Sequence, residues 1–480
     1  MKRKLSLLLA VLMLLSACAN DTADETTADT SASADTAVET ETETEKKYLD
    51  NLPEDLTFGG SDYNMLIREG KVYDTIVEEM IGEIVYDAIA ERTLMLEDRF
   101  DIQFQLTPLP FDAGTWTNAI AASVQASDGA YDVVLPDYWW GIELGGYFQD
   151  LNQIEYFDFD QDYWCSGWNE NTEFFGKLYT AVGDWSLDLV GNTMGIYFNQ
   201  AIIEEFQLEH PYDLVKSGDW YHDTFYNMAE SVVTDLNGDG RYNLGTDMMG
   251  VSYQLHGGRG FLYCYGVEFG KQDENGSWTL DYFDERFVDI YNTVYDMHNK
   301  SKGVSYSFGD AFANMFASGS ELFLVSTFYT SRGTTLRDME DDFGIVPYPK
   351  YDEKQADYLS YNLGTSYMAI LKSATNPEMS AAVMEALSAA NHKTVVPTLY
   401  EDALKDKYSR DPVAAEMLDI MQSRIRFDFA YVHEASLGNC ANKYFDAIAS
   451  GQPVASTHRS IEKLNTRLLA KLLELYEEME

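Results

Sequence analysis

Strands and helices alternate in a fixed order after residue 55, and this order constrains the fold more than any other feature of the chain. Apolar runs predict strands at Tyr63–Ile67, Asp101–Leu106 and Tyr131–Leu135. Apolar residues at helical spacing predict helices at 82–100 and 116–125 between them. A β–α–β–α–β order is typical of an α/β sheet with crossover helices, and we expect that fold class here.

The size and composition of the chain suggest more than one lobe. The part from Tyr48 to Glu480 exceeds what one hydrophobic core usually organises, so we expect two lobes or domains. The whole chain is 45% hydrophobic and 14% aromatic, so we expect this part to be globular. The net charge of −47 repels nucleic acid, and no basic stripe counters it, so nucleic-acid binding is excluded.

The N-terminus has the three parts of an export signal. Three cations at positions 2–4 precede an apolar run over residues 7–15, which is too short for a permanent membrane span. The following Leu15–Cys18 segment resembles the lipobox of bacterial lipoproteins, in which the cysteine becomes the lipidated first residue. We therefore expect a signal peptide at 1–17 and a Cys18 acylated with chains such as palmitate. An ordinary cleavage site with an incidental cysteine is the alternative.

Residues 18–50 are expected to form a tether between the lipid and the folded body. Residues 19–45 are almost wholly Ala, Thr, Ser, Asp and Glu, so they cannot bury apolar area and their carboxylates repel one another. A solvated spacer explains this composition best, and a functional acidic tail is the alternative. The protein would then be anchored at the cell membrane on its extracellular face.

The remaining cysteines give no sign of a metal site. Cys165, Cys264 and Cys440 are far apart and have no Cys/His partner at zinc spacing. Free thiols are expected, and one disulfide among them remains open.

An aromatic run follows the third predicted strand, where an open α/β sheet binds its ligands. The run consists of Asp137, Tyr138, Trp139 and Trp140. Adjacent aromatic side chains are costly to expose, so they need a ligand, a partner surface or a covering loop.

Several segments in order resemble bacterial extracellular solute-binding proteins, in the group that includes the maltose-binding protein. The matching segments are Tyr131–Val134, Gly176–Tyr179, Gly195–Asn199, Pro211–Trp220 and Phe343–Lys350. The resemblance implies a two-lobed periplasmic-binding-protein-like fold of type II, with a hinge that closes on a solute. It places lobe 1 at 56–185 plus 361–395 and lobe 2 at 186–360 plus 396–480. The crossings would fall near 184–190, 361–370 and 392–397.

The same resemblance implies a carbohydrate, and an oligosaccharide in particular, as the ligand. Sugar recognition needs flat apolar faces for C–H surfaces and fixed polar groups for hydroxyls. The candidate ligand-binding residues are Asp137, Tyr138, Trp139, Trp140, Asp184, Trp185, Tyr253, Ser326, Tyr329, Asn362 and Phe427. We expect Ser326–Tyr329 to form a turn after a strand at 321–325, and His256–Gly260 to form a glycine-rich turn. Each candidate taken alone is as consistent with core or loop packing.

One loop resembles the opening of an EF-hand calcium site. Asp235, Asn237, Asp239 and Asn243 place oxygen atoms at alternate positions, with glycine at the sixth position and a carbonyl from Arg241. The twelfth position departs from the pattern, because it holds Thr and the next carboxylate comes one place late. A structural Ca²⁺ is thus one reading, and an Asx/Gly-rich turn without an ion is the other. No cofactor is required.

Catalytic motifs are missing from the sequence. There is no Gly-x-Ser-x-Gly, no His-Glu-x-x-His and no phosphate-binding glycine pattern. We therefore expect no enzyme. The expected protein is a monomeric, lipid-anchored receptor that delivers a carbohydrate to the permease subunits of an ABC transporter. A surface-anchored carbohydrate-active enzyme and a receptor for a membrane sensor are the alternatives.

Overall fold

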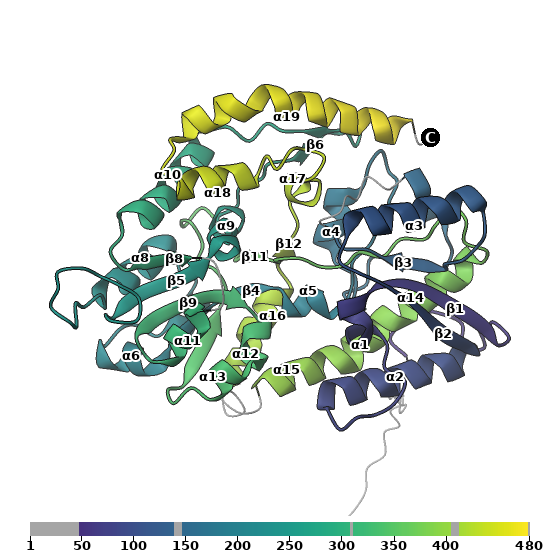
Figure 1. Cartoon of the computed structure of the whole chain (residues 1–480), viewed down its shortest axis with the longest axis horizontal. Coiled ribbons are helices and arrows are strands. Elements are labelled where there is room, and N and C mark those ends of the chain that lie inside the picture. Colours follow the sequence, from purple (N-terminus) through teal and green to yellow (C-terminus); the bar gives the residue numbers. More distant parts are fainter. Residues whose placement is uncertain (1–47, 139–145, 308–310, 405–411, 479–480) are drawn as a thin grey trace, which may run out of the picture. The chain divides into compact units, whose positions relative to one another are not determined.

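The computed structural model describes residues 48–138, 146–307, 311–404 and 412–478 (Figure 1). The predicted signal peptide, Cys18 and nearly all of the predicted tether lie outside the described residues. Trp139 and Trp140 also lie outside them.

The first sheet contains the three strands expected from the sequence. β1 (Ser61–Arg68) lies between β2 (Ile102–Leu109) and β3 (Val133–Leu135), and all three run parallel. The helices α2 (Ile84–Phe100) and α3 (Ala113–Ala126) make the crossovers, so the predicted β–α–β–α–β order is confirmed. These crossovers place the carboxyl ends of all three strands at one edge.

Local chemistry sets the ends of the two crossover helices. α2 ends where Asp101 takes a left-handed conformation with φ of 49°. α3 begins three residues before the predicted Trp116, because the side chain of Asp112 caps it by accepting the Thr115 amide at 2.7 Å.

A later segment of the chain completes the first sheet. Residues 366–371 run antiparallel to β3, where Ala369 bridges to Val134. The neighbouring Met368 bridges to Ala181, in another segment of the chain. The helix α14 (Pro377–Ala390) follows and packs on this sheet, where Tyr63 donates to the Ser380 carbonyl at 3.0 Å. The first sheet is therefore assembled from two distant stretches of sequence.

The second sheet has five strands in the order β10-β4-β9-β5-β8. β4 runs antiparallel to β9 and β10, whereas β5 runs parallel to β8 and β9. Their bounds are β4 Met194–Asn199, β5 Met249–Gln254, β8 Val304–Ser307, β9 Glu321–Thr327 and β10 Phe343–Val346. Both sheets belong to one compact unit.

The remaining elements connect and cover the two sheets. In the first half they are η1 Glu69–Lys71, α1 Val72–Thr75, η4 Leu151–Gln153, α4 Ser166–Thr172, α5 Leu187–Gly191, α6 Gln200–Glu205, α7 Pro211–Ser217 and α8 His222–Ser231. In the second half they are α9 Leu255–Cys264, β6 Lys271–Gln272, β7 Trp278–Thr279, α10 Glu285–Lys300, α11 Ala311–Ala317, α12 Tyr329–Arg332, α13 Thr334–Arg337, β11 Ser360–Tyr361, η5 Asn391–Val395, α15 Val396–Leu404, α16 Pro412–Gln422, β12 Ile425–Arg426, α17 Phe429–Val432, α18 Asn442–Ala449 and α19 Val454–Glu477.

Two local expectations are wrong. The segment 256–260 is helical and lies within α9. Its glycines are needed for close packing of this helix rather than for a turn, since a Cβ on Gly258 would lie 2.0 Å from the Phe445 ring. Ser326 and Thr327 belong to β9, since each pairs with a residue of β4, so the turn begins only at residue 328.

Two further properties concern the described residues as a whole. Cys165, Cys264 and Cys440 are free thiols. None of the described helices is both long enough and apolar enough to cross a bilayer.

Candidate ligand-binding site

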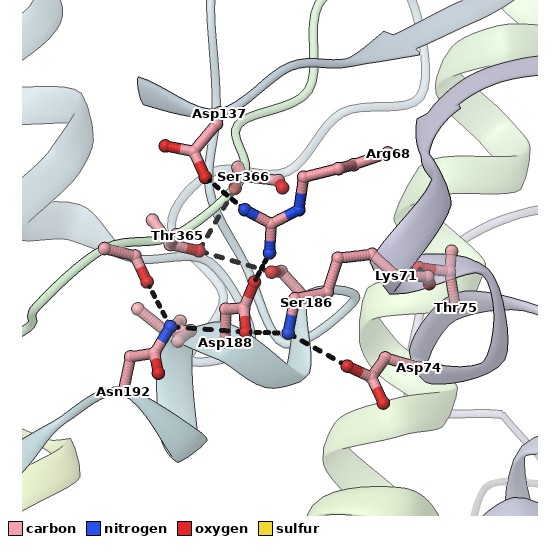
Figure 2. Close-up of polar contacts among 12 residues, drawn as sticks. Arg68, Lys71, Asp74, Thr75, Asp137, Ser186, Asp188, Asn192, Thr365 and Ser366 are labelled. Atoms are coloured by element: carbon pink, nitrogen blue, oxygen red, sulfur yellow. Dashed lines mark hydrogen bonds and ion pairs between the residues drawn. The ribbon is translucent and has the colours of Figure 1, made fainter. Parts of the chain in front are cut away.

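The carboxyl ends of β1 and β3 bring two charged side chains together. Arg68 is the last residue of β1, and its Nη1 donates to Oδ2 of Asp137, just after β3, at 2.7 Å (Figure 2). The Asp137 side chain is 5% exposed, so the ion pair is largely desolvated. Ligands of open α/β sheets bind outside this edge, and the pair therefore marks a candidate site.

A second, more deeply buried carboxylate joins this pair from α5. Asp188 contacts the ammonium of Lys71 through Oδ1 and lies 3.7 Å from Nη2 of Arg68 through Oδ2. Lys71 also donates to Asp74 at 3.0 Å (Figure 2). Burial raises the pKa of Asp188, and the two cations oppose this rise. Burial disfavours the charged form of Lys71, but Asp188 and Asp74 outweigh it and raise the pKa of Lys71.

Hydrogen bonds hold the segments behind this charged cluster in place. The hydroxyls of Ser186 and Thr365 lie 3.2 Å apart, and Asn192 donates to the Gly364 carbonyl at 2.7 Å (Figure 2). Asn362 is fully buried and donates to the carbonyls of residues 188 and 189. The predicted first and second crossings are thus tied together directly beside the cluster.

Tyr329 brings the second sheet to the same place. It begins α12, shortly after β9, and Lys71 Nζ lies 5.4 Å from the centre of its ring. A Cβ on Gly191 would lie 2.1 Å from the ring, so α5 needs glycine there. Among the described residues, the buried Tyr329 hydroxyl has no hydrogen-bond partner. A polar ligand group could satisfy it.

Tyr138 contacts two tyrosines that lie far along the chain, through a group of hydroxyls. Its hydroxyl donates to that of Tyr431 in α17 at 2.5 Å, and the Tyr361 hydroxyl lies 2.8 Å from the same oxygen. A pocket of about 160 Å³ opens here, and residues 432, 434, 435 and 439 complete its lining. Burial raises the pKa of all three tyrosines, so their hydroxyls stay neutral donors and acceptors.

One exposed aromatic ring completes the candidate site. Phe111 lies just after β2 and is 61% exposed, with the Arg68 guanidinium 5.2 Å from its ring centre. An exposed ring at the carboxyl edge of the sheet offers a flat face for stacking.

Several residues of this site are absent from the sequence-based candidates, among them Arg68, Lys71, Phe111 and Asp188. A signal was available for the first three, because they follow predicted strands as Asp137 does. Asp188 lies within the predicted first crossing, where no local pattern distinguishes it.

Asp184 lines a different and larger cavity. This cavity of about 860 Å³ is also lined by Trp164, Leu189 and His392. Asp184 Oδ2 lies 2.6 Å from Nδ1 of His392, which links the predicted first and third crossings. Burial raises the pKa of Asp184, and the hydrogen bond to Asp184 raises the pKa of His392.

Other candidates from the sequence lie in packed surroundings. Trp185 is 1% exposed. Tyr253 is fully buried and its hydroxyl lies 3.0 Å from His298 Nδ1. Phe427 packs against the Trp168 ring at 5.1 Å. Ser326 is half-buried and hydrogen-bonded to Thr330. A ligand contact by any of them stays a prediction.

The candidate calcium loop is closed by its own hydrogen bonds. The carboxylate of Asp235 accepts the amides of Gly238 and Gly240 at 2.7 and 2.8 Å. Asp247, the late carboxylate, accepts the Leu236 amide at 3.1 Å and the Asn243 amide at 2.8 Å. Within the described ranges, no three His, Cys, Asp or Glu side chains are grouped to hold a metal. Calcium binding here stays a prediction.

Comparison with known proteins gives one family and many similar folds. Residues 85–390 match the family model described as bacterial extracellular solute-binding protein. No curated protein matches the chain.

Three solved structures illustrate the similarity of fold. The sugar-binding protein MalE from Xanthomonas citri is 15% identical, with a TM-score of 0.56 over 87% of this chain and 99% of its own. A cyclo/maltodextrin-binding protein in complex with maltotetraose is 14% identical, with a TM-score of 0.53 over 87% and 96%. The galacto-N-biose-/lacto-N-biose I-binding protein of an ABC transporter from Bifidobacterium longum, in complex with lacto-N-biose, is 14% identical, with a TM-score of 0.53 over 86% and 98%.

Proposed function

The chain belongs to the bacterial extracellular solute-binding proteins, with their two-lobed α/β fold of type II, and we propose that it captures a carbohydrate for an ABC importer. The ligand would be an oligosaccharide held between the two lobes. The proposed lobe boundaries are 56–185 plus 361–395 and 186–360 plus 396–480.

The convergence of both sheets on one charged cluster is the observation that carries this proposal. Arg68, Lys71 and Asp137 come from the carboxyl edge of the first sheet, and Tyr329 follows a strand of the second. Asp188 lies between them in α5. A solute at this edge would therefore contact both sheets, as capture between two lobes requires.

The chemistry of the cluster suits a neutral, hydroxyl-rich ligand. The cations are already paired with carboxylates, so a charged solute would have to break an ion pair. Tyrosine hydroxyls and the exposed ring of Phe111 offer hydrogen bonds and a stacking face. The maltotetraose and lacto-N-biose bound to two structurally similar proteins support a carbohydrate.

Capture would work through a shift between open and closed states. A solute that contacts both lobes binds the closed state better, and this difference in affinity drives closure. The hydrogen bonds at Ser186, Asn192 and Asn362 would hold the crossings while the lobes move. The importer's permease subunits would then recognise the closed monomer.

The location we propose follows from the N-terminal sequence. Cys18 would carry the lipid, and the acidic tether would keep the receptor on the extracellular face, near its importer. A structural Ca²⁺ held by Asp235, Asn237, Asp239, the Arg241 carbonyl and Asn243 is proposed as a separate, non-catalytic feature.

A thermal-shift screen of the mature protein tests the ligand class. A ligand at about a hundred times its dissociation constant adds about 2.7 kcal/mol to stability. We expect neutral oligosaccharides to raise the unfolding midpoint, and their chain length to remain unchanged on incubation. A response to peptides or metal chelates but to no sugar would contradict the proposal, and hydrolysis of the sugar would favour the enzyme.

A further inference from the structure

A groove lies between α2 on one side and α14, η5 and α15 on the other. α2 packs against α14, η5 and α15 in turn, and α2 and α15 lie side by side (Figure 1). Their facing residues leave a groove of about 380 Å³, which residues 48–50 also line. The walls are mainly small or apolar, with Ala88 and Met95 on α2 and Ala386 and Ala390 on α14. This volume is within the range of small-molecule sites.

The groove is lined by one buried arginine whose charge has no counter-charge among the described residues. Arg92 is 3% exposed, and its Nη2 donates to the Thr75 carbonyl at 2.5 Å. Throughout the described residues, no atom accepts a hydrogen bond from its Nε or Nη1. Burial lowers the pKa of Arg92 to about 9, so the guanidinium is still charged at neutral pH. An uncompensated buried charge costs several kcal/mol.

The neighbouring arginine shows how the chain compensates a buried guanidinium elsewhere in the same groove. Arg99 lies two turns further along α2 and donates to both oxygens of Asp50, each at 2.7 Å. Its guanidinium also lies 3.8 Å from the centre of the Tyr48 ring. At the rim, the exposed Glu91 and Lys393 carry opposite charges. Among the described residues that line the groove, the buried charge left without compensation is that of Arg92.

The opposite wall has an unusual backbone. Residues Asn391–Val395 form a π-helical turn between α14 and α15, and Lys393 and Thr394 from this turn line the groove. π-Helical turns within α-helices are frequent at functional sites.

We propose that this groove binds a monocarboxylate with an apolar body, with the carboxylate at Arg92 and the body along the alanine-rich wall. The carboxylate supplies the missing counter-charge to the Arg92 guanidinium, which lines the groove. The apolar walls favour such a ligand over inorganic phosphate, which has no apolar part to bury. The groove is lined by none of the residues of the charged cluster, so this site is separate from the carbohydrate site.

Isothermal titration of the sugar-free mature protein tests the proposal, with sodium octanoate as the probe and octan-1-ol as its uncharged match. We expect octanoate to bind at least tenfold more tightly than octanol or phosphate. Arg92→Met should reduce octanoate affinity at least tenfold, and it should fold, because apolar replacement of a buried charge is often tolerated. Ala390→Leu, which fills the groove and keeps Arg92, should also reduce the affinity for octanoate. Arg424→Met, which replaces a half-exposed arginine outside the groove, should leave that affinity unchanged.

Three results would overturn the inference: no binding of octanoate, equal affinity for octanoate and octanol, or equal affinity of the wild type and Arg92→Met. The carbohydrate screen is read separately, so either proposal can fail alone.

Discussion

Replacing Asp188 with asparagine tests whether the charged cluster holds the carboxyl edge of the first sheet to α5. The substitution keeps the size and one oxygen of the side chain and removes its charge. Lys71 would then keep Asp74 at 3.0 Å, and Arg68 would keep Asp137 at 2.7 Å.

The expected cost follows from burial and from these remaining partners. Removing one partner of a buried ion pair costs about 3–5 kcal/mol when the other charge is left uncompensated. The side chain of Asp188 is 2% exposed, but both cations retain a second carboxylate. We therefore expect about 2 kcal/mol, which for a body of this size lowers Tm by about 2 °C.

Thermal and urea unfolding at pH 7.5 without sugar provide the assay. Asp74→Asn is the matched control, because Asp74 pairs with the same lysine but its side chain is 21% exposed. A more exposed pair contributes about 0–1 kcal/mol, so the control should lose less than about 1 °C. A control that loses as much stability as Asp188→Asn, or an Asp188→Asn protein as stable as the wild type, would refute the reasoning.

Three further predictions concern other parts of the molecule. Burial raises the pKa of Glu385 from 4.5 to about 7, so the folded wild type should lose about 3 kcal/mol of stability relative to Glu385→Gln as the pH rises from 4.5 through 7. Urea unfolding of both proteins at about pH 4.5 and about pH 8 measures this loss. A difference in unfolding free energy between the two proteins that is the same at both pH values would contradict the prediction. Gly258→Ala should cost about 1–3 kcal/mol because its Cβ would overlap the Phe445 ring, whereas Gly70→Ala, with no atom within 4 Å, should be close to neutral in the same melts. If the loop at 235–243 binds calcium, Ca²⁺ should raise the Tm of the wild type and a chelator should reverse the rise. The Tm of Asp239→Ala should not respond to Ca²⁺. A wild-type Tm that does not change with Ca²⁺ would show that the loop is a turn without an ion.

The sequence predicted the first sheet well because its signals are local. Tyr63–Ile67 and the apolar spacing of 82–100 each reflect burial of one face, and the structure confirms both elements within a few residues. The glycine content of one segment was misleading. The glycine-rich composition of 256–260 predicted a turn, but Gly258 lies inside α9, where the ring of Phe445, distant in sequence, packs against its backbone.

The candidate site was predictable only in part. Asp137 and Tyr138 follow a predicted strand, and the rule for open sheets leads directly to them. The same rule applied to Tyr63–Ile67 would have reached Arg68 and Lys71. Asp188 and Tyr329 meet Lys71 only through the three-dimensional fold, since more than a hundred residues separate them from it. No spacing along the chain encodes such contacts.

The dissociation constant of the best sugar from the thermal-shift screen, measured by isothermal titration for three proteins, tests the central claim most directly. Phe111→Ala removes an exposed ring at the carboxyl edge of the first sheet, and Leu236→Ala removes an equally exposed apolar side chain in the calcium-like loop. If a carbohydrate binds at that edge, Phe111→Ala should weaken binding about tenfold, since stacking contributes on the order of 1 kcal/mol or more, and Leu236→Ala should match the wild type. Unchanged affinity for Phe111→Ala, or an equal loss in both variants, would contradict the account.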